Sequence, residues 1–277
     1  MNAEDLSKGR AEYILSPSNR TLSHVRKLRK KHVRDEEGLL VLEGANLLEE
    51  AIRRHIHLTD VLIAEDAKAD RLGALLEESV PKSRIKLLPR DLFEQVAEAV
   101  NGSGFLAIAE KPRLSKEQLR EYLSPGDNVL VLDRVQDPGN IGTMVRTAVA
   151  AGYRAVLTMK GTADCYSSKV LRATAGMIFA IPVLPLEGPE ELASFTKELG
   201  KQLTVTDPAG GIPYFSCDLT RDIALVIGNE GKGVDPAVMT AAEKRVTIPM
   251  CEGIESLNAA VAAALLMYEA HRIPAEL

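Results

Sequence analysis

Aromatic residues are scarce in this 277-residue chain. Phe, Tyr and Trp together make up 4% of it, and tryptophan is absent. Proteins that bind single-stranded RNA commonly stack bases on exposed aromatic rings, so the composition disfavours that mode of recognition. The formal net charge is only −5 and does not by itself indicate a nucleic-acid partner. An RNA-binding surface would therefore have to come from a local cluster of cations.

Paired cysteines and long apolar runs are also missing. The three cysteines, Cys165, Cys217 and Cys251, are an odd number, lie far apart and form no CxxC pair. This pattern disfavours a disulfide framework and a zinc site, and it favours buried thiols in a reducing, cytoplasmic setting. No apolar run reaches the roughly 18–20 residues of a membrane span. The polar, acidic first residues are unlike a signal peptide. We therefore expect a cytoplasmic protein that contains no metal and does not cross a membrane.

Apolar residues are plentiful, at 45%, and they fall into alternating strand-like and helix-like segments. Strand patterns cover 38–44, 60–66, 84–89, 104–110, 128–133, 155–159, 181–186, 202–207, 222–228 and 245–250. Helix patterns cover 45–54, 70–79, 90–100, 139–152, 167–176, 189–200 and 256–272. This alternation predicts an α/β fold, whose C-terminal half contains a mostly parallel sheet with helices on both faces.

The polar segment 111–126 separates the two halves. It contains Pro112, Pro125 and Gly126 and no long apolar run, which is typical of a linker. We predict a smaller N-terminal α/β domain over residues 1–110, a linker over 111–126 and a C-terminal domain over 127–277.

One cluster of cations stands out in the N-terminal half. Residues 20–34 read RTLSHVRKLRKKHVR, with seven Lys or Arg and no acid. Leu22, Val25 and Leu28 recur at helical spacing, so the segment is predicted to be one basic amphipathic helix. Such a face can be merely solvated, or it can contact RNA phosphates. The RNA-binding residues expected in the second case are Arg26, Lys27, Arg29 and Lys30.

Three segments of the C-terminal half combine small residues with isolated polar ones. DPGNIGTMVRTAVAAG (137–152) places Arg146 inside a helix of small and apolar residues. LVIGNEGKGV (225–234) ends an apolar strand in a loop with three glycines, which allows a ligand to approach the backbone at Gly228. The spacing fits neither the dinucleotide fingerprint nor the P-loop. A tight turn explains the glycines equally well, but it does not require Glu230.

The third segment is IPMCEGIESLNAAVAAAL (248–265), in which a loop leads into an Ala-rich helix. Ser256 is the expected N-cap of that helix, because its hydroxyl can accept from the first backbone N–H groups. Asn258 then has no capping duty and is free to bind a ligand or a neighbouring loop. The helix is nearly uncharged, so most of its surface must be buried by this chain or by a second subunit.

In this order the three segments resemble the three motifs of the SpoU (TrmH) family of RNA ribose 2′-O-methyltransferases. The N-terminal half is similar to the small α/β RNA-binding domain of many rRNA-modifying members. The resemblance implies S-adenosylmethionine as methyl donor, RNA as substrate, a homodimer formed through the C-terminal domain, and a deep trefoil knot in that domain. Periodicity alone would not suggest the knot, because true knots are rare.

The resemblance also implies the residues of the site. The polar active-site set consists of Asn140, Arg146, Glu230, Ser256 and Asn258. The residues expected around the cofactor are Ile227, Gly228, Asn229, Ile248 and Leu257. Lys169 and Arg172 lie in a small-residue segment that family members share, and we expect them to face RNA.

The family assigns the general base to Arg146, although free arginine has a pKa above about 12. A second interpretation is that Arg146 orients the 2′-hydroxyl and stabilises the developing oxyanion, and both remain open. Asn140 would position Arg146 or the ribose, and Glu230 would orient Arg146 through a charged hydrogen bond.

Rival functions are a base methyltransferase of the same superfamily, a non-catalytic RNA-binding or ribosome-assembly protein, and a dinucleotide-dependent oxidoreductase. The sequence NEGKG followed by SLN disfavours the first. A non-catalytic protein would be expected to lack Arg146 or Asn140, and an oxidoreductase would need a GxGxxG motif after its first strand. Among RNA substrates, the extra N-terminal domain favours rRNA over tRNA. Housekeeping and antibiotic-resistance roles both remain open.

Overall fold

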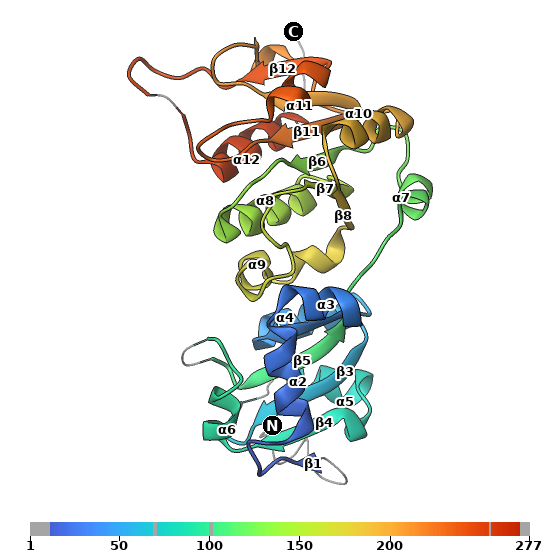
Figure 1. Cartoon of the computed structure of the whole chain (residues 1–277), viewed down its shortest axis with the longest axis vertical. Helices are drawn as coiled ribbons and strands as arrows, with labels where there is room; N and C mark the ends of the chain where they lie inside the picture. Colours follow the sequence, from blue (N-terminus) through green and yellow to red (C-terminus); the bar gives the residue numbers. More distant parts are fainter. Residues whose placement is uncertain (1–11, 69–70, 100–101, 255, 272–277) are drawn as a thin grey trace. The chain divides into compact units, whose positions relative to one another are not determined.

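The computed structural model describes residues 12–68, 71–99, 102–254 and 256–271, and the chain divides into two compact units (Figure 1). Unit 1 comprises the residues up to Pro112 together with Tyr166–Phe179, and unit 2 comprises Arg113–Cys165 and the residues from Ala180 onward. The polar N-terminal segment 1–11 and three expected helix ends, Asp70, Val100 and Arg272, lie outside the described residues. Within the described ranges, no helix is long and apolar enough to span a membrane.

Unit 1 is built on a five-stranded mixed sheet in the order β1-β4-β3-β5-β2. Strand β4 runs parallel to β1 and β3, whereas β5 runs antiparallel to β3 and β2. The strands are β1 (Glu12–Tyr13), β2 (Leu39–Glu43), β3 (Leu58–Ala64), β4 (Ile85–Leu88) and β5 (Phe105–Glu110). The helices are α2 (Arg20–Leu28), α3 (Lys31–Glu37), α4 (Ala45–Arg53), α5 (Arg71–Ser79), α6 (Arg90–Glu94) and α9 (Ser168–Thr174), with a short 3-10 turn η1 (Lys82–Arg84). The predicted alternation of strands and helices is confirmed.

The prediction of one basic helix over residues 20–34 is wrong, because the chain breaks between α2 and α3. Lys30 has an extended backbone, with φ −85° and ψ 128°. The buried Arg34 guanidinium donates to the carbonyl oxygens of Leu28 at 2.9 Å and Arg29 at 2.7 Å. These carbonyls at the end of α2 would otherwise lack partners, so Arg34 stabilises the helix end. An arginine that the sequence suggested for the basic face is therefore a buried structural group.

Unit 2 contains a seven-stranded sheet in the order β10-β12-β9-β11-β6-β7-β8, with every pairing parallel. The strands are β6 (Val129–Leu132), β7 (Ala155–Met159), β8 (Val183–Leu186), β9 (Gln202–Thr206), β10 (Ile212–Pro213), β11 (Ile223–Ile227) and β12 (Lys244–Thr247). The helices are α7 (Lys116–Tyr122), α8 (Pro138–Ala150), α10 (Pro189–Glu198), α11 (Pro236–Ala241) and α12 (Ala259–Glu269), with 3-10 turns η2 (Met177–Ala180) and η3 (Tyr214–Ser216). Turn η2 spans the boundary between the two units.

The central strands of unit 2 are buried on both faces, which explains their continuous apolar runs. Alternate residues of β6, β7, β9 and β11, such as Val131 and Val205, share one core with α7, α10 and α11. Helices α8 and α12 pack on each other and lie on the side of the sheet away from α10 and α11 (Figure 1). The predicted parallel sheet with helices on both faces is confirmed, and the trefoil knot stays a prediction.

The segment expected to be a linker, 111–126, contains helix α7 of unit 2. Ser115 and Gln118 form a capping box at its start. Leu119 is fully buried in the unit 2 core, and Lys116 and Arg120 form ion pairs with two glutamates of α10. A seven-residue helix is too short to be stable alone, so these contacts hold it in place.

Candidate active site

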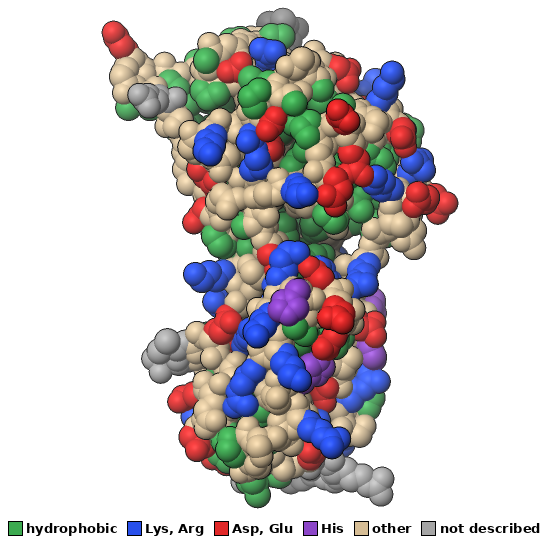
Figure 2. Space-filling view, viewed as in Figure 1, with side chains coloured by type: hydrophobic (Ala, Val, Ile, Leu, Met, Phe, Trp, Pro, Cys, Tyr) green, Lys and Arg blue, Asp and Glu red, His purple; other side chains and the backbone are tan. Residues whose placement is uncertain are grey.

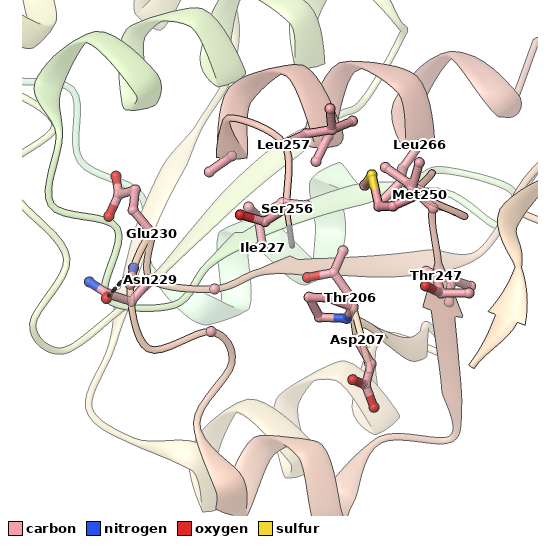
Figure 3. Close-up of a pocket in the computed structure, with 18 residues that line it drawn as sticks. Thr206, Asp207, Ile227, Asn229, Glu230, Thr247, Met250, Ser256, Leu257 and Leu266 are labelled. Carbon is pink, nitrogen blue, oxygen red and sulfur yellow. Dashed lines mark hydrogen bonds between the residues drawn. The ribbon is translucent and has the colours of Figure 1, made fainter. Parts of the chain in front are cut away.

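A cavity of about 290 Å³ opens at the carboxyl ends of β9, β11 and β12 (Figure 3). Its walls come from the loops after these strands and from the start of α12. The lining residues are Thr206, Asp207, Pro208, Ile227, Gly228, Asn229, Glu230, Gly231, Gly233, Val246, Thr247, Ile248, Met250, Ser256, Leu257, Ala259, Ala262 and Leu266. In open α/β sheets, ligands bind in the crevice outside the carboxyl ends of the strands, so the position fits a ligand site.

All five residues expected around the cofactor line this cavity, but two of them do so for reasons that the sequence did not suggest. The side chain of Asn229 stabilises its own loop: Nδ2 donates to the carbonyl oxygen of Arg134 at 2.9 Å, and Oδ1 accepts from the N–H groups of Gly231 and Lys232 at 3.1 and 3.0 Å. A Cβ added at Gly228 would lie 2.3 Å from the backbone nitrogen of Val234. The loop thus folds back against position 228, and only glycine leaves room for it.

Three polar residues from the three motif segments form one hydrogen-bonded chain beside the cavity. Glu230 Oε1 accepts from Asn140 Nδ2 at 3.1 Å, and Asn140 Oδ1 accepts from Asn258 Nδ2 at 3.0 Å. Glu230 also accepts from the backbone N–H groups of Gln136 and Asp137, both at 3.1 Å. The carboxylate therefore joins the loop after β11 to the start of α8.

The hydrogen bonds of Glu230 keep it ionised. Partial burial raises the pKa of Glu230, but the hydrogen bonds from Asn140, Asp137 and Gln136 outweigh this effect, and the net pKa lies below its ordinary value. A carboxylate that has a lowered pKa and accepts three hydrogen bonds is a weak proton acceptor. Glu230 is therefore suited to hold neighbouring groups in place rather than to exchange protons.

The expected division of roles between Ser256 and Asn258 is wrong. Helix α12 begins at Ala259, and Asn258 is its N-cap, with Oδ1 accepting from the N–H groups of Ala260 at 2.9 Å and Val261 at 3.2 Å. Asn258 thus uses its oxygen to cap α12 and its amide nitrogen to bind Asn140. Ser256 lies outside the helix, is exposed and lines the cavity, so its hydroxyl is available to a ligand.

Arg146 lies apart from this cluster. It follows Asn140 by six residues on α8, which places it roughly 9 Å further along the helix axis and about 120° around it. Its side chain is exposed and has no hydrogen bond or ion pair with any residue that the structure describes. The expectation that Glu230 orients Arg146 is therefore wrong, because Glu230 binds Asn140 and the backbone instead.

The basic residues of α2 and its C-terminal turn differ in whether their side chains are free to bind a phosphate. Lys and Arg side chains spread over the face of unit 1 on which α2 and α3 lie (Figures 1 and 2). Lys27 and Lys30 are exposed and have no partner among the described residues, and Arg26 donates to one backbone carbonyl. Arg29, however, is ion-paired at 3.0 Å with Glu43, which is 6% exposed. It therefore stabilises unit 1 and is not available as a free phosphate-binding cation.

The two cations expected to face RNA on α9 differ in a similar way. Lys169 is exposed and has no partner in the described part of the chain, whereas Arg172 lies 3.8 Å from a carboxylate oxygen of Glu98. Both side chains reach solvent, and the ion pair of Arg172 is long enough to be exchanged for a phosphate.

Sequence reasoning missed several groups near the cavity. Thr206 and Asp207 line it from the end of β9, and Asp133 and Arg134 form a charged network behind the loop after β11. An acid or a polar residue at the end of a buried parallel strand was the available signal. The described residues contain no group of three or more His, Cys, Asp or Glu side chains that could hold a metal ion. Cys165 and Cys217 are buried, as expected for simple thiols, whereas Cys251 is exposed.

Comparison with known proteins matches both halves of the chain. Residues 127–268 match the SpoU rRNA Methylase family, and residues 19–107 match the MRM3-like substrate binding domain. The 23S rRNA (guanosine(2553)-2′-O)-methyltransferase RlmP of Bacillus subtilis (strain 168) is 34% identical, over 92% of this chain and 97% of its own length. This relative therefore matches the chain across both units.

Two solved structures are similar over nearly the whole chain. The AdoMet-bound rRNA methyltransferase from Sinorhizobium meliloti has a TM-score of 0.83 and 26% identity, covering 95% of this chain and 98% of that one. The SpoU methyltransferase AviRb from Streptomyces viridochromogenes, in complex with AdoMet, has a TM-score of 0.82 and 26% identity, covering 91% and 97%. Both similarities extend over the sheet whose strand ends surround the cavity.

Proposed function

The chain belongs to the SpoU rRNA methylase family, and from this premise we propose that it methylates ribose 2′-hydroxyl groups of ribosomal RNA with S-adenosylmethionine. It is an RNA ribose 2′-O-methyltransferase. The observation that carries the proposal is the hydrogen-bonded chain Glu230–Asn140–Asn258, which joins all three motif segments beside one cavity. Ribosomal RNA is favoured because the Bacillus subtilis relative is named for 23S rRNA and because unit 1 matches a substrate-binding domain.

The residues of the cavity fit S-adenosylmethionine. Apolar side chains such as Ile227, Met250 and Leu266 suit a flat adenine base. The carboxylates of Asp207 and Glu230 at the cavity wall favour a ligand with positive charge, and the exposed loop backbone offers donors and acceptors to a ribose. When bound, the cofactor supplies an electrophilic methyl group. The protein must therefore hold the 2′-oxygen in line with it and remove the hydroxyl proton.

We assign these tasks to the polar residues as follows. The exposed guanidinium of Arg146 orients the 2′-hydroxyl and stabilises the oxyanion that forms as the proton passes to water, because it carries five N–H donors and has no other partner in the described structure. Glu230 and Asn140 position the loop after β11 against α8. Ser256 contacts the target nucleotide, and Asn258 holds the start of α12 in register with Asn140.

The two domains divide the work. The N-terminal domain, residues 1–110, binds the RNA substrate through Arg26, Lys27 and Lys30, with Lys169 and Arg172 of α9 as further phosphate contacts. The C-terminal domain, residues 127–277, carries the cofactor and the chemistry. Electrostatic binding of this kind is expected to weaken steeply as salt rises, because each neutralised phosphate releases a counterion. The odd, widely spaced cysteines support a cytoplasmic location.

The active protein is a homodimer formed through unit 2. Helix α12 packs on α8 with one side and exposes apolar side chains on the other: Val261 is 50% exposed, Leu265 40% and Tyr268 51%. Apolar residues gathered on one helix face favour burial against a second copy. Light scattering after gel filtration should give twice the mass of the chain for wild type. Leu265→Glu should shift it toward the monomer, and a monomeric wild type would refute the dimer.

An assay of methyl transfer to rRNA tests the proposed ribose 2′-O-methylation. Purified protein is incubated with labelled S-adenosylmethionine and total rRNA from cells that lack the corresponding methyltransferase, and the RNA is digested to nucleosides. We expect the wild-type protein to place label in a 2′-O-methylated nucleoside and the Arg146→Ala variant to place little there. Label in a base would refute ribose methylation. If the protein binds S-adenosylmethionine and methylates tRNA but no rRNA, the substrate is tRNA and the assignment to rRNA is wrong.

A further inference from the structure

Arg134 occupies an unusual backbone conformation at the carboxyl end of β6. Its φ is +57°, in the left-handed region that favours glycine, asparagine or aspartate and that an arginine rarely adopts. In this position its N–H donates to Thr162 Oγ1 at 3.0 Å, and its carbonyl oxygen accepts from Asn229 Nδ2 at 2.9 Å. The strained backbone thus connects the loop after β7 to the loop after β11, on the two strands that flank β6.

The side chain of Arg134 adds a second set of connections. Nε donates at 3.0 Å to Asp133, whose side chain is 1% exposed, and Nη1 lies 3.3 Å from Asp235 Oδ2. Asp133 in turn accepts from the backbone N–H of Asp235 at 2.6 Å. Hydrogen bonding to Asp133 raises the pKa of Arg134, so the guanidinium remains a permanent cation between the two acids. Asp235 is the last residue of segment 228–235, and Asp133 binds the backbone of that segment at Asp235. Residues 228–231 and 233 of the segment line the cavity.

The loop after β7 is shaped around the same side chain. A Cβ at Gly161 would lie 3.2 Å from Arg134 Cγ, and Gly161 itself has φ +94°. The side chain of Gln136 donates to the carbonyl of Gly161. The aliphatic part of the Arg134 side chain therefore lies closely against the loop after β7, and its guanidinium lies against the loop after β11. Since its donors face internal acceptors, Arg134 is not a candidate to bind RNA phosphate.

We propose that Arg134 is a positioning residue that fixes segment 228–235 in the shape that binds the cofactor, before the cofactor arrives. The inference rests on the proposed function only in naming S-adenosylmethionine as the ligand. Arg134 does not itself line the cavity or belong to the polar chain, so it acts through Asn229, Gly233 and Asp235. A loop held in its bound shape loses less conformational freedom on binding, which strengthens affinity without a new contact.

The test replaces the guanidinium while keeping the backbone conformation easy to adopt. Arg134→Asn and Arg134→Gly both tolerate positive φ, so they remove the side-chain contacts without adding strain. Arg134→Lys keeps the charge but cannot pair with both acids at once. Arg154→Asn is the matched control, because Arg154 is also an ion-paired arginine of unit 2 but lies at the opposite end of β7.

Two measurements on the full-length protein are needed. The first is the Kd of S-adenosylmethionine by calorimetry. We expect it to rise about tenfold or more in Arg134→Asn and Arg134→Gly, because charged hydrogen bonds of this kind are lost, with a smaller rise in Arg134→Lys and none in Arg154→Asn. The second is amide hydrogen exchange without cofactor. Peptides covering 228–235 should exchange faster in the first two variants, while β11 and β6 keep wild-type protection.

The two measurements distinguish a local role of Arg134 in segment 228–235 from a general role in the stability of the fold. Unchanged affinity and exchange in Arg134→Asn would overturn the inference. Faster exchange throughout unit 2 would also overturn it, because Arg134 would then stabilise the fold in general. If wild type does not bind S-adenosylmethionine, the proposed function fails, and the exchange experiment still decides whether Arg134 holds segment 228–235 in place.

Discussion

Replacing Glu230 with glutamine is the sharpest test of the polar chain at the cavity. The change keeps size and shape but removes the charge and one acceptor. Glu230 accepts three hydrogen bonds of 3.1 Å, from Asn140 Nδ2 and from the N–H groups of Gln136 and Asp137. The NH₂ group of a glutamine cannot accept, so at least one of these donors would face another donor.

The structure sets the size of the effect. A hydrogen bond to a charged group contributes about 1.5–3 kcal/mol when it is buried. Glu230 is exposed, so solvent replaces part of the loss, and we expect Glu230→Gln to lower the free energy of unfolding by about 1 kcal/mol. The effect on methyl transfer should be larger, about tenfold in kcat/KM, because the loop after β11 also forms the cavity wall.

A double-mutant cycle tests the pairing itself. Glu230→Gln, Asn140→Ala and the double variant are compared by denaturant unfolding and by methyl transfer, with Glu187→Gln, an 86% exposed glutamate, as control. Residues in direct contact should show a coupling energy of about 1 kcal/mol. Strictly additive effects, or an effect of Glu187→Gln as large as that of Glu230→Gln, would refute the argument that Glu230 acts through Asn140.

The difference in stability between wild type and Glu230→Gln should also depend on pH. The folded state lowers the pKa of Glu230 below its ordinary 4.5, so its contribution to stability is complete above that pH and is lost as the pH falls through the folded value. The stability difference between wild type and Glu230→Gln should therefore be constant near neutral pH and shrink below about pH 4.5. A difference that grows on acidification would contradict the assignment.

Three further changes test other parts of the structure. Gly228→Ala places a Cβ 2.3 Å from the backbone of Val234, so the loop must move, and calorimetry should show that cofactor binding is largely lost while the protein remains folded by circular dichroism. Lys27→Ala combined with Lys30→Ala should weaken rRNA binding and flatten its salt dependence in filter-binding assays, with unchanged affinity for S-adenosylmethionine; unchanged RNA affinity would make them solvated residues only. Tyr153→Phe should raise the free energy of unfolding by about 1 kcal/mol, because the buried Tyr153 hydroxyl has no partner among the described residues, and a loss of stability would reveal one.

The sequence predicted the architecture of unit 2 well, for a physical reason. Strands such as 129–132 and 223–227 are buried on both faces and must be apolar throughout, so each one is a continuous run of apolar residues in the sequence. The three polar motif segments were also found in advance: the fold brings two of them to one cavity, and the first is hydrogen-bonded to both beside it. Glycine and polar residues after apolar strands were the signal, because such loops meet at one edge of a parallel sheet.

The roles of individual polar side chains could not be predicted in the same way. Arg29 and Arg34 look like members of a basic face, yet one pairs with a buried glutamate and the other caps a helix end. Asn258 looked free, yet it is an N-cap. The arginines depend on partners between 5 and 14 residues away, and Asn258 also binds Asn140, which lies 118 residues away. Local pattern states which residues can form hydrogen bonds but not which partners the fold supplies.

Helix α7 has a practical consequence for anyone who wishes to produce the methyltransferase half separately. Its Leu119 is fully buried in the core of unit 2, although it precedes the first strand of the sheet. An expression fragment beginning at residue 127 would leave a hole there, at a cost of about 2–5 kcal/mol, and would expose apolar surface that promotes aggregation. A fragment beginning at residue 113 keeps the helix with its ion pairs to α10. The choice of first residue, rather than any property of the catalytic loops, could decide whether such a fragment stays in solution.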